Sequence, residues 1–258
     1  MRVLVTNDDG IDAPGLAVLA AALSGAGHDI TVVAPIGDAS GAGTGVRLTV
    51  DRPIAIRRTT VDGVTFVGVD GTPALAVMLA RMGAFGAPPT CVVAGINVGS
   101  NTGRSILHSG TVGAALTGAS MGMSALAVSL HARRPENLES AAQVAGLALT
   151  WLAGARKRTV LNVNVPDLPL SRLRGVRWGR LAAFSQTRAT IAEVRDDEIE
   201  LRLTGSTLPL DPATDAGLVE NGYVVVTPLL GIQAAGDDAA ATAIEAELTR
   251  RSVPIPSG

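Results

Sequence analysis

Two adjacent carboxylates lie near the start of the chain, in the segment Asn7-Asp8-Asp9-Gly10. The apolar run Val3-Leu4-Val5 precedes them, and a helix-like segment opened by Pro14 follows. This order predicts the first strand of an α/β sheet, with Asp8 and Asp9 at its carboxyl end, where open α/β folds bind ligands. Adjacent carboxylates repel unless a proton or cation lies between them, and hard divalent cations take oxygen ligands. The pair therefore indicates a cation site, although Asn and Asp are also common helix caps.

Two glycine-rich loops, residues 37–45 and 95–103, follow later strand-like runs. In the first loop, closely spaced glycines allow backbone N–H groups to line an anion site, and Ser40 adds a neutral oxygen. No lysine lies near it, so it is not a Gly-Lys-Ser/Thr phosphate loop, and a flexible surface loop is the alternative. In the second loop, Asn97 and Asn101 offer amide oxygens to a cation and NH₂ groups to a phosphate. Asparagines also form turns by themselves.

A helix of small residues is predicted to begin within His108-Ser109-Gly110-Thr111. Its free N–H groups, its dipole and two hydroxyls would suit a phosphate, although Ser109 also makes an ordinary helix cap. His108 could protonate a leaving group or simply fill space. If all these loops leave one sheet edge, the simplest ligand that they could share is a metal-bound phosphate. The sequence contains no Ser-His-Asp order, zinc spacing or dinucleotide fingerprint.

Alternating strand and helix signals predict the sheet that must bring these residues together. Strands are expected at 2–6, 30–34, 91–94, 125–130, 159–163 and 223–227. Helices are expected from Pro14 to about residue 25 and at 72–83, 111–120, 137–152 and 237–251. The order favours one three-layer, doubly wound (Rossmann-like), mostly parallel α/β sheet within a single domain, residues 1–258.

Apolar spacing predicts the buried face of two of these helices. The expected core positions are Leu75, Met78, Leu79 and Met82 in one helix, and Val144, Leu147, Ala148 and Trp151 in the other.

Two segments interrupt the alternation. Residues 53–69 predict an edge hairpin around Asp62-Gly63. Residues 176–205 include two half-exposed strand patterns around Asp196-Asp197, which predict a protruding antiparallel hairpin arm outside the main sheet.

The composition excludes several classes of protein. With 258 residues, 47% apolar and 17% charged, the chain is long enough for a full core and is not disordered. Only 2% aromatic residues and a net charge of −2 argue against a nucleic-acid partner. The basic cluster between Arg156 and Arg188 is interpreted as a solvated face or subunit contact rather than a phosphate-steering patch. A single cysteine, Cys91, and the lack of a signal-like or membrane-spanning run predict a cytoplasmic protein.

The motifs resemble those of the SurE (stationary-phase survival protein) nucleotidase family, in order from residue 1 to about 230. The matching blocks are residues 3–11, 13–16, 33–35, 40–43, 70–74, 95–97, 109–115, 161–166, 222–224 and 227–229. Thr44 and Gly45 depart from the usual His or Arg followed by Ser, and His108 replaces a frequent Tyr. Both departures lie beside the expected pocket, so they bear on substrate preference.

The resemblance implies a metal-dependent phosphatase that acts on nucleoside 5′- and 3′-monophosphates. By position, Asp8, Asp9, Ser40 and Asn97 would hold one Mg²⁺ or Mn²⁺ ion per subunit. Asn101, Ser109, Gly110 and Thr111 would border the phosphate. The hairpin arm would be exchanged between subunits of a homodimer or homotetramer.

The expected reaction is hydrolysis of a phosphomonoester, in which Asp8 or Asp9 orients or deprotonates the nucleophile. Two alternatives come from other classes of protein. One is an oligomeric nucleotide sensor that binds phosphate without cleaving it. The other is a two-lobed sugar-nucleotide transferase, because residues 27–35 resemble the start of such proteins. That class needs a second nucleotide-binding lobe, for which 258 residues leave little room.

Overall fold

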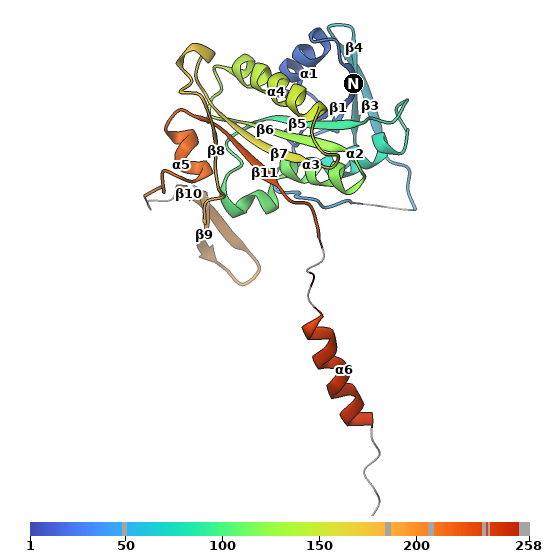
Figure 1. The fold of residues 1–258 in the computed structure, drawn as a ribbon. Coiled ribbons are helices and arrows are strands. Elements are labelled where there is room, and N and C mark those ends of the chain that lie inside the picture. Colours follow the sequence, from blue (N-terminus) through green and yellow to red (C-terminus); the bar gives the residue numbers. More distant parts are fainter. Residues whose placement is uncertain (48–50, 184–186, 206–208, 234–235, 237, 253–258) are drawn as a thin grey trace, which may run out of the picture.

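The computed structural model describes residues 1–47, 51–183, 187–205, 209–233, 236 and 238–252. Within these residues the main sheet has nine strands, in the order β3-β4-β2-β1-β5-β6-β7-β11-β8 (Figure 1). The strands are β1 (Arg2–Thr6), β2 (Asp29–Pro35), β3 (Ile56–Val61), β4 (Val64–Val69), β5 (Cys91–Val98), β6 (Ser124–His131), β7 (Val160–Pro166), β8 (Val176–Trp178) and β11 (Val224–Leu229).

Six neighbouring strands, from β4 through β2, β1, β5 and β6 to β7, are parallel to one another. Strand β3 joins antiparallel to β4 at one edge. On the other side, β11 joins antiparallel to β7, and β8 pairs parallel to β11 at the edge. The predicted doubly wound, mostly parallel sheet is therefore confirmed. The strand order reverses between β1 and β5, and open α/β sheets bind ligands at the carboxyl ends of the strands at such a point.

Helices cover both faces of this sheet and complete the three layers (Figure 1). Helices α1 (Pro14–Gly25) and α4 (Leu138–Ala153) pack on one face, over Val3 and Val5 of β1. Helices α2 (Pro73–Arg81) and α3 (Gly110–Ser120) pack on the other, over Leu4. Shorter elements are η1 (Gly103–His108), η2 (Leu170–Arg172) and α5 (Asp215–Glu220).

The predicted buried faces of two helices were wrong in part. In α4, Leu147 is 73% exposed and Trp151 is 61% exposed, and in the other helix Met82 follows the last turn of α2 and is 72% exposed. The expected positions Leu75 and Val144 are buried, together with Leu149 and Leu152. Alanines take other inner positions and permit close helix packing: Ala141, Ala142, Ala145, Ala74, Ala76 and Ala80 are buried.

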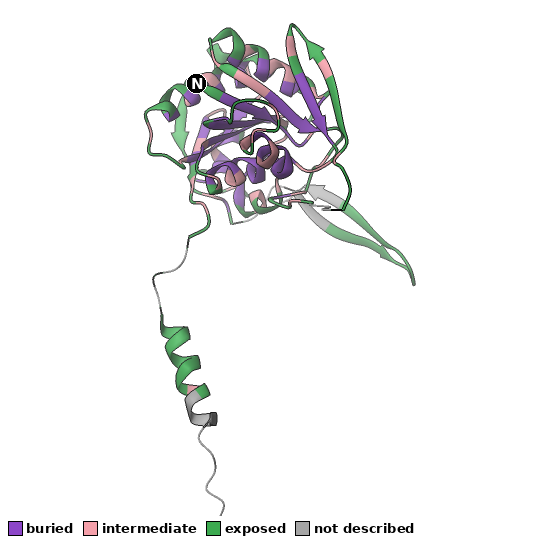
Figure 2. Cartoon of the chain, turned by 90° about the vertical axis from the view of Figure 1, so that its right-hand side faces the viewer, coloured by how far each residue is buried: buried purple, intermediate pink, exposed green. Residues whose placement is uncertain are grey.

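Both predicted hairpins are present. Strands β3 and β4 pair around Asp62 and Gly63, which have positive φ angles of 49° and 80°, as a tight hairpin turn requires. The expected hairpin range begins at residue 53, whereas its first strand begins at Ile56. Strands β9 (Thr187–Val194) and β10 (Ile199–Gly205) form a separate antiparallel sheet that extends from the body (Figure 2). Residues 184–186 of the predicted arm lie outside the described residues.

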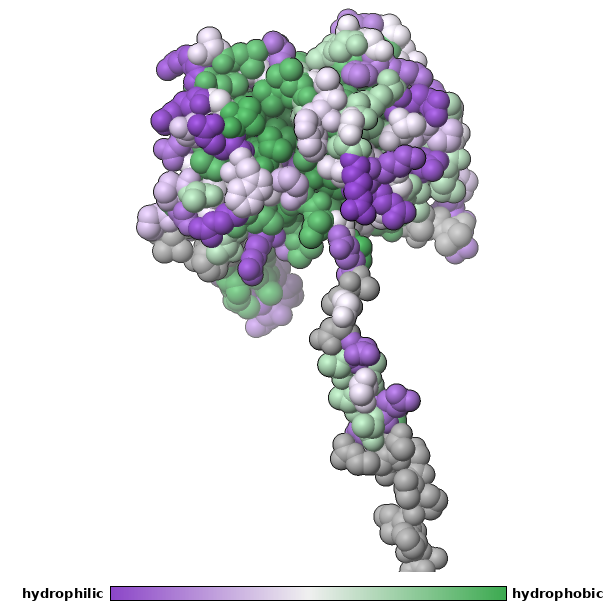
Figure 3. All heavy atoms as spheres, in the orientation of Figure 1, coloured by the Kyte–Doolittle hydropathy of each residue, from purple (hydrophilic) through white to green (hydrophobic). Residues whose placement is uncertain are grey.

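The predicted closing helix is α6 (Ala239–Ser252), which lies apart from the sheet (Figure 1). Residue 237, its expected start, lies outside the described residues. Apolar and charged residues lie side by side along α6 (Figure 3). Within the described part of the chain, no helix combines the length and apolarity needed to cross a membrane.

Candidate metal and phosphate site

Asp8 lies just after the carboxyl end of β1, and its side chain is hydrogen-bonded to the start of α3. Its side chain accepts a hydrogen bond from the backbone N–H of Thr111 at Oδ2, over 3.0 Å, and a second from the Thr111 hydroxyl at Oδ1. A Cβ added at Gly110 would lie only 2.7 Å from Asp8 Cβ and from Oδ2. Glycine is therefore required where α3 begins, because the first turn of the helix lies against the carboxylate.

The surroundings of the two predicted carboxylates disfavour their ionisation, chiefly through burial. Burial raises the pKa of Asp8, and the hydrogen bonds from Thr111 oppose that rise. Burial, followed by the negative charges of Asp8 and Asp38, raises the pKa of Asp9 to about 6, against the backbone hydrogen bond from Val98. A cation between these groups would remove the penalty, because an opposite charge stabilises the ionised carboxylates.

Two buried side-chain oxygens in the segment Asn7-Asp8-Asp9 have no hydrogen-bond partner among the described residues: Asp9 Oδ2 and Asn7 Oδ1. The other end of the Asn7 amide is occupied, because Nδ2 donates to the Gly10 carbonyl over 2.9 Å. A buried acceptor without a donor is costly. These oxygens are suited to a cation, since a cation needs acceptors and supplies no proton.

The loop after β2 brings Ser40 to the same edge. Its position is fixed by Asp38, whose Oδ1 accepts from the Ser40 N–H over 2.8 Å and from the Ser40 hydroxyl over 2.6 Å. The neighbouring Ala39 N–H donates to the Asp8 carbonyl over 2.8 Å. Asp38 was not among the predicted site residues, although its place two residues before Ser40 in the same loop was a usable signal.

Asn97 is on β5, the strand that pairs with β1 at the reversal point. Its Nδ2 donates to the Gly99 carbonyl over 2.7 Å, so the amide nitrogen shapes the turn. The amide oxygen is the ligand atom that Asn97 can offer.

Asn101 is held by β6 and β7. Its backbone N–H donates to Asn164 Oδ1 over 2.9 Å, and its own Nδ2 donates to the Ser129 hydroxyl over 2.8 Å. Its carbonyl accepts from Asn162 Nδ2 and Asn164 Nδ2, over 2.8 and 2.9 Å. Sequence analysis gave no role to these two asparagines, although Asn-Val-Asn places both on one side of a strand.

The Ser109 hydroxyl accepts from the Val112 N–H over 3.1 Å. Ser109 therefore caps α3, which was the alternative to a phosphate-binding role. The side chain of His108 is exposed, while its carbonyl accepts from Gly43 N over 3.2 Å. A Cβ at Gly113 would lie 2.0 Å from the Gly43 carbonyl oxygen. The Ser40 loop therefore packs closely against the start of α3.

The oxygen donors suit a hard divalent cation. The described residues contain no group of three or more His, Cys, Asp or Glu side chains placed to hold a metal, so a cation here would depend on Asp8 and Asp9 together with neutral oxygens. Carboxylate, hydroxyl and amide oxygens are the ligands that Mg²⁺ and Mn²⁺ prefer, and both ions keep several waters.

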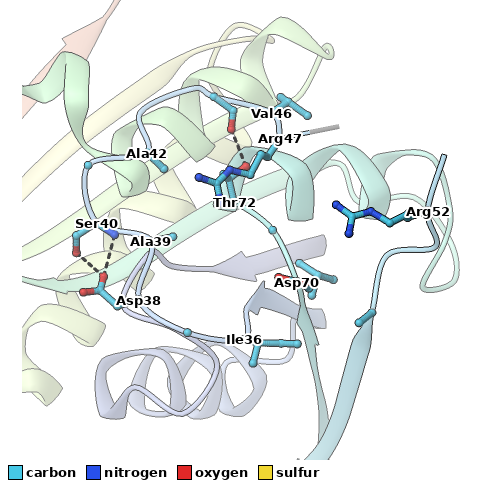
Figure 4. Close-up of a pocket in the computed structure, with 16 residues that line it drawn as sticks. Ile36, Asp38, Ala39, Ser40, Ala42, Val46, Arg47, Arg52, Asp70 and Thr72 are labelled. Carbon is cyan, nitrogen blue, oxygen red and sulfur yellow. Dashed lines mark hydrogen bonds between the residues drawn. The ribbon is translucent and has the colours of Figure 1, made fainter. Parts of the chain in front are cut away.

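A cavity of about 1100 Å³ adjoins the Ser40 end of this cluster (Figure 4). The loop after β2 forms one wall, and Asp70 and Thr72, between β4 and α2, form another. The Thr72 hydroxyl donates to the Gly45 carbonyl over 2.6 Å, which fixes the two walls to each other. Arg47 and Arg52 also line the cavity.

Several members of the basic cluster have local partners. The guanidinium groups of Arg174 and Arg177 lie 4.8 and 4.9 Å from the centre of the Tyr223 ring, and Arg180 forms an ion pair with Asp211. These contacts favour the structural interpretation of the cluster.

Comparison with known proteins identifies the family. The model of the family "Survival protein SurE" matches residues 3–188. The chain is 41% identical over 235 residues to the 5′-nucleotidase SurE of Pseudomonas entomophila, covering 89% of this chain and 92% of that protein. It is 43% identical over 237 residues to the 5′-nucleotidase SurE of Methylococcus capsulatus, covering 89% and 91%.

The crystal structure of the SurE protein from Aquifex aeolicus superposes with a TM-score of 0.79 at 30% identity, covering 95% of this chain and 100% of that one. The sequence and the fold together show that this chain belongs to the SurE family.

Proposed function

We propose that the protein is a metal-dependent phosphomonoesterase that hydrolyses nucleoside 5′- and 3′-monophosphates to a nucleoside and phosphate. The observation that carries this proposal is the pair Asp8 and Asp9 at the sheet reversal point, with a buried Asp9 oxygen that has no hydrogen-bond partner among the described residues. The names of the SurE relatives, 5′-nucleotidases, support the substrate class.

Asp8, Asp9, Ser40 and Asn97 would hold one Mg²⁺ or Mn²⁺ ion. When bound, such an ion supplies positive charge to the phosphoryl oxygens and makes water more acidic. The donor chemistry of these four residues fits it. Burial raises the pKa of both carboxylates, and a bound cation would favour their ionised forms.

The protein's own groups would position the substrate. Thr111 fixes the orientation of Asp8, and Asp8 or Asp9 would orient or deprotonate the attacking group. Ser109, Gly110 and Thr111 at the start of α3, together with Asn101, would border the phosphate, because the positive end of the helix dipole favours an anion. The adjoining cavity is large enough for a nucleoside.

Two further proposals concern the protein's setting. The arm carries exposed apolar side chains, Ile191, Val194, Ile199 and Leu201, each more than 60% exposed in this chain. Such a surface fits the expected homodimer or homotetramer formed through the arm. A cytoplasmic location fits the buried free thiol of Cys91.

The test is phosphate release from a panel of 5′- and 3′-nucleoside monophosphates after EDTA treatment, with Mg²⁺ or Mn²⁺ restored. Release that depends on the added metal is the expected result, and the panel ranks the bases and phosphate positions. Nucleotide binding without release under any of these metals, in a folded protein, would overturn the proposal in favour of a sensor.

A further inference from the structure

Two arginines at the large cavity have no assigned role in hydrolysis. Arg47 belongs to the loop after β2, and Arg52 lies just before β3, on the opposite wall. Figure 4 shows the Arg52 side chain pointing into the cavity and the Arg47 side chain lying over it beside Thr72. Both arginines therefore line the same cavity, which adjoins the Ser40 end of the proposed cation site.

Neither of these arginines forms an ion pair within the described part of the chain, in contrast to a near neighbour. Arg57 on β3 donates to Asp12 over 2.5 Å. The carboxylates that line the cavity are Asp38, which is bonded to Ser40, and Asp70. Asp38 lies at the end of the cavity that adjoins the proposed cation site. The rest of the cavity is therefore lined by two positive groups, Arg47 and Arg52, and one negative group, Asp70. It therefore has positive charge that a ligand could neutralise.

We propose that Arg47 and Arg52 bind a second phosphate on the substrate, so that the site takes nucleoside bisphosphates, with phosphates on both the 3′ and 5′ oxygens, in preference to monophosphates. This inference rests on the proposed function and specifies its substrate class. One phosphate would lie at the Asp8–Ser40 end and be hydrolysed, the nucleoside would span the cavity, and the second phosphate would contact the arginines.

The chemistry of arginine supports this assignment. A guanidinium group presents a planar set of N–H donors that matches phosphate, often through two parallel hydrogen bonds. A neutral nucleoside gives two unpaired arginines nothing comparable to bind. A linear polyphosphate offers the same charge, but it would leave the nucleoside-sized volume of the cavity unfilled.

The experiment compares kcat/KM for adenosine 3′,5′-bisphosphate, adenosine 5′-monophosphate and inorganic tripolyphosphate. It uses the wild type, Arg47→Gln/Arg52→Gln, and Arg58→Gln as a matched control, because Arg58 is an exposed arginine on β3 that does not line the cavity. The double variant is expected to lower the ratio of bisphosphate to monophosphate kcat/KM about 10-fold or more, which corresponds to one or two charge-assisted hydrogen bonds. The control variant should leave that ratio unchanged.

Calorimetric binding of the same two nucleotides in EDTA gives a readout that does not depend on turnover. The wild type should bind the bisphosphate more tightly than the monophosphate, and the double variant should bind them alike. Equal binding by the wild type, a parallel loss for both nucleotides, or a loss confined to tripolyphosphate would overturn the inference. If no metal supports hydrolysis of any substrate, the proposed function fails, and the calorimetry still decides whether the arginines recognise a second phosphate.

Discussion

Thr111 and Asp8 are 103 residues apart in the sequence, and Thr111 donates to both carboxylate oxygens of Asp8. One donor is the backbone N–H in the first turn of α3, and the other is the side-chain hydroxyl. This pair joins the end of β1 to the start of α3. It also fixes the orientation of a carboxylate that is only 3% exposed.

Replacing Thr111 with valine should destabilise the protein, because it removes the hydroxyl donor from a buried carboxylate. The expected loss is about 1–3 kcal/mol in the free energy of unfolding, measured by urea denaturation. Thr111→Ser retains the hydroxyl and should lose less. Equal stability of the valine variant and the wild type would mean that the hydroxyl contributes nothing to holding Asp8.

Asp9→Asn should stabilise the metal-free protein at high pH. The pKa of Asp9 is raised from 3.8 to about 6 in the folded state. A raised folded-state pKa contributes stability that is present below about pH 4 and is lost as the pH rises through about 6. Asparagine removes that loss, so in EDTA the melting temperature of Asp9→Asn should exceed that of the wild type by more at pH 8 than at pH 4.5. A constant difference at both pH values would contradict this account.

Gly110→Ala should disrupt the site, whereas Gly146→Ala should not. A Cβ at Gly110 would lie 2.7 Å from Asp8 Cβ, while a Cβ at Gly146 meets no atom within 4 Å. Both glycines lie in helices, so alanine at position 146 should stabilise by roughly 0.5–1 kcal/mol through helix propensity alone. Thermal unfolding of both variants provides the comparison. Stabilisation of both would show that the first turn of α3 can move away from Asp8 at no cost.

Asn164→Leu should release the Asn101 loop. The Asn164 side chain accepts from the Asn101 N–H and donates to its carbonyl, whereas Asn162 makes only the second kind of contact. Leucine at position 164 leaves the partly buried Asn101 N–H without its partner, at an expected cost of about 1–3 kcal/mol. Asn162→Leu is the matched control and should lose less stability in the same urea titration. The reverse order of the two losses would contradict the assigned hydrogen bonds.

The parts of the fold that follow from local pattern could be predicted from the sequence. Strand β1 was expected at 2–6 and is Arg2–Thr6, because its apolar run is short and bounded. The buried face of α4 could be predicted only in part from apolarity, since Val144 is buried as expected whereas Leu147 and Trp151 are exposed. Which apolar residues lie inward depends on the spacing between layers, and that spacing is a tertiary property.

The same division applies to the candidate site. Asp8 and Thr111 could be singled out because each has a recognisable local context, a strand end and a helix start. Their direct contact depends on the packing of α3 against β1. Asp38, Asn162, Asn164 and the two cavity arginines were missed because their place in the site depends on partners from distant segments.

The most direct test of the central claim is metal-rescued hydrolysis of adenosine 5′-monophosphate by EDTA-treated wild type and Asp8→Asn, with Mn²⁺ binding measured on the same samples. The wild type should bind Mn²⁺ and recover phosphate release. Asp8→Asn should remain folded, bind Mn²⁺ more weakly and lose at least about 100-fold in turnover, since even outer partners of a metal site cost 10- to 100-fold. Near-normal turnover and Mn²⁺ affinity in the folded Asp8→Asn protein would contradict the account.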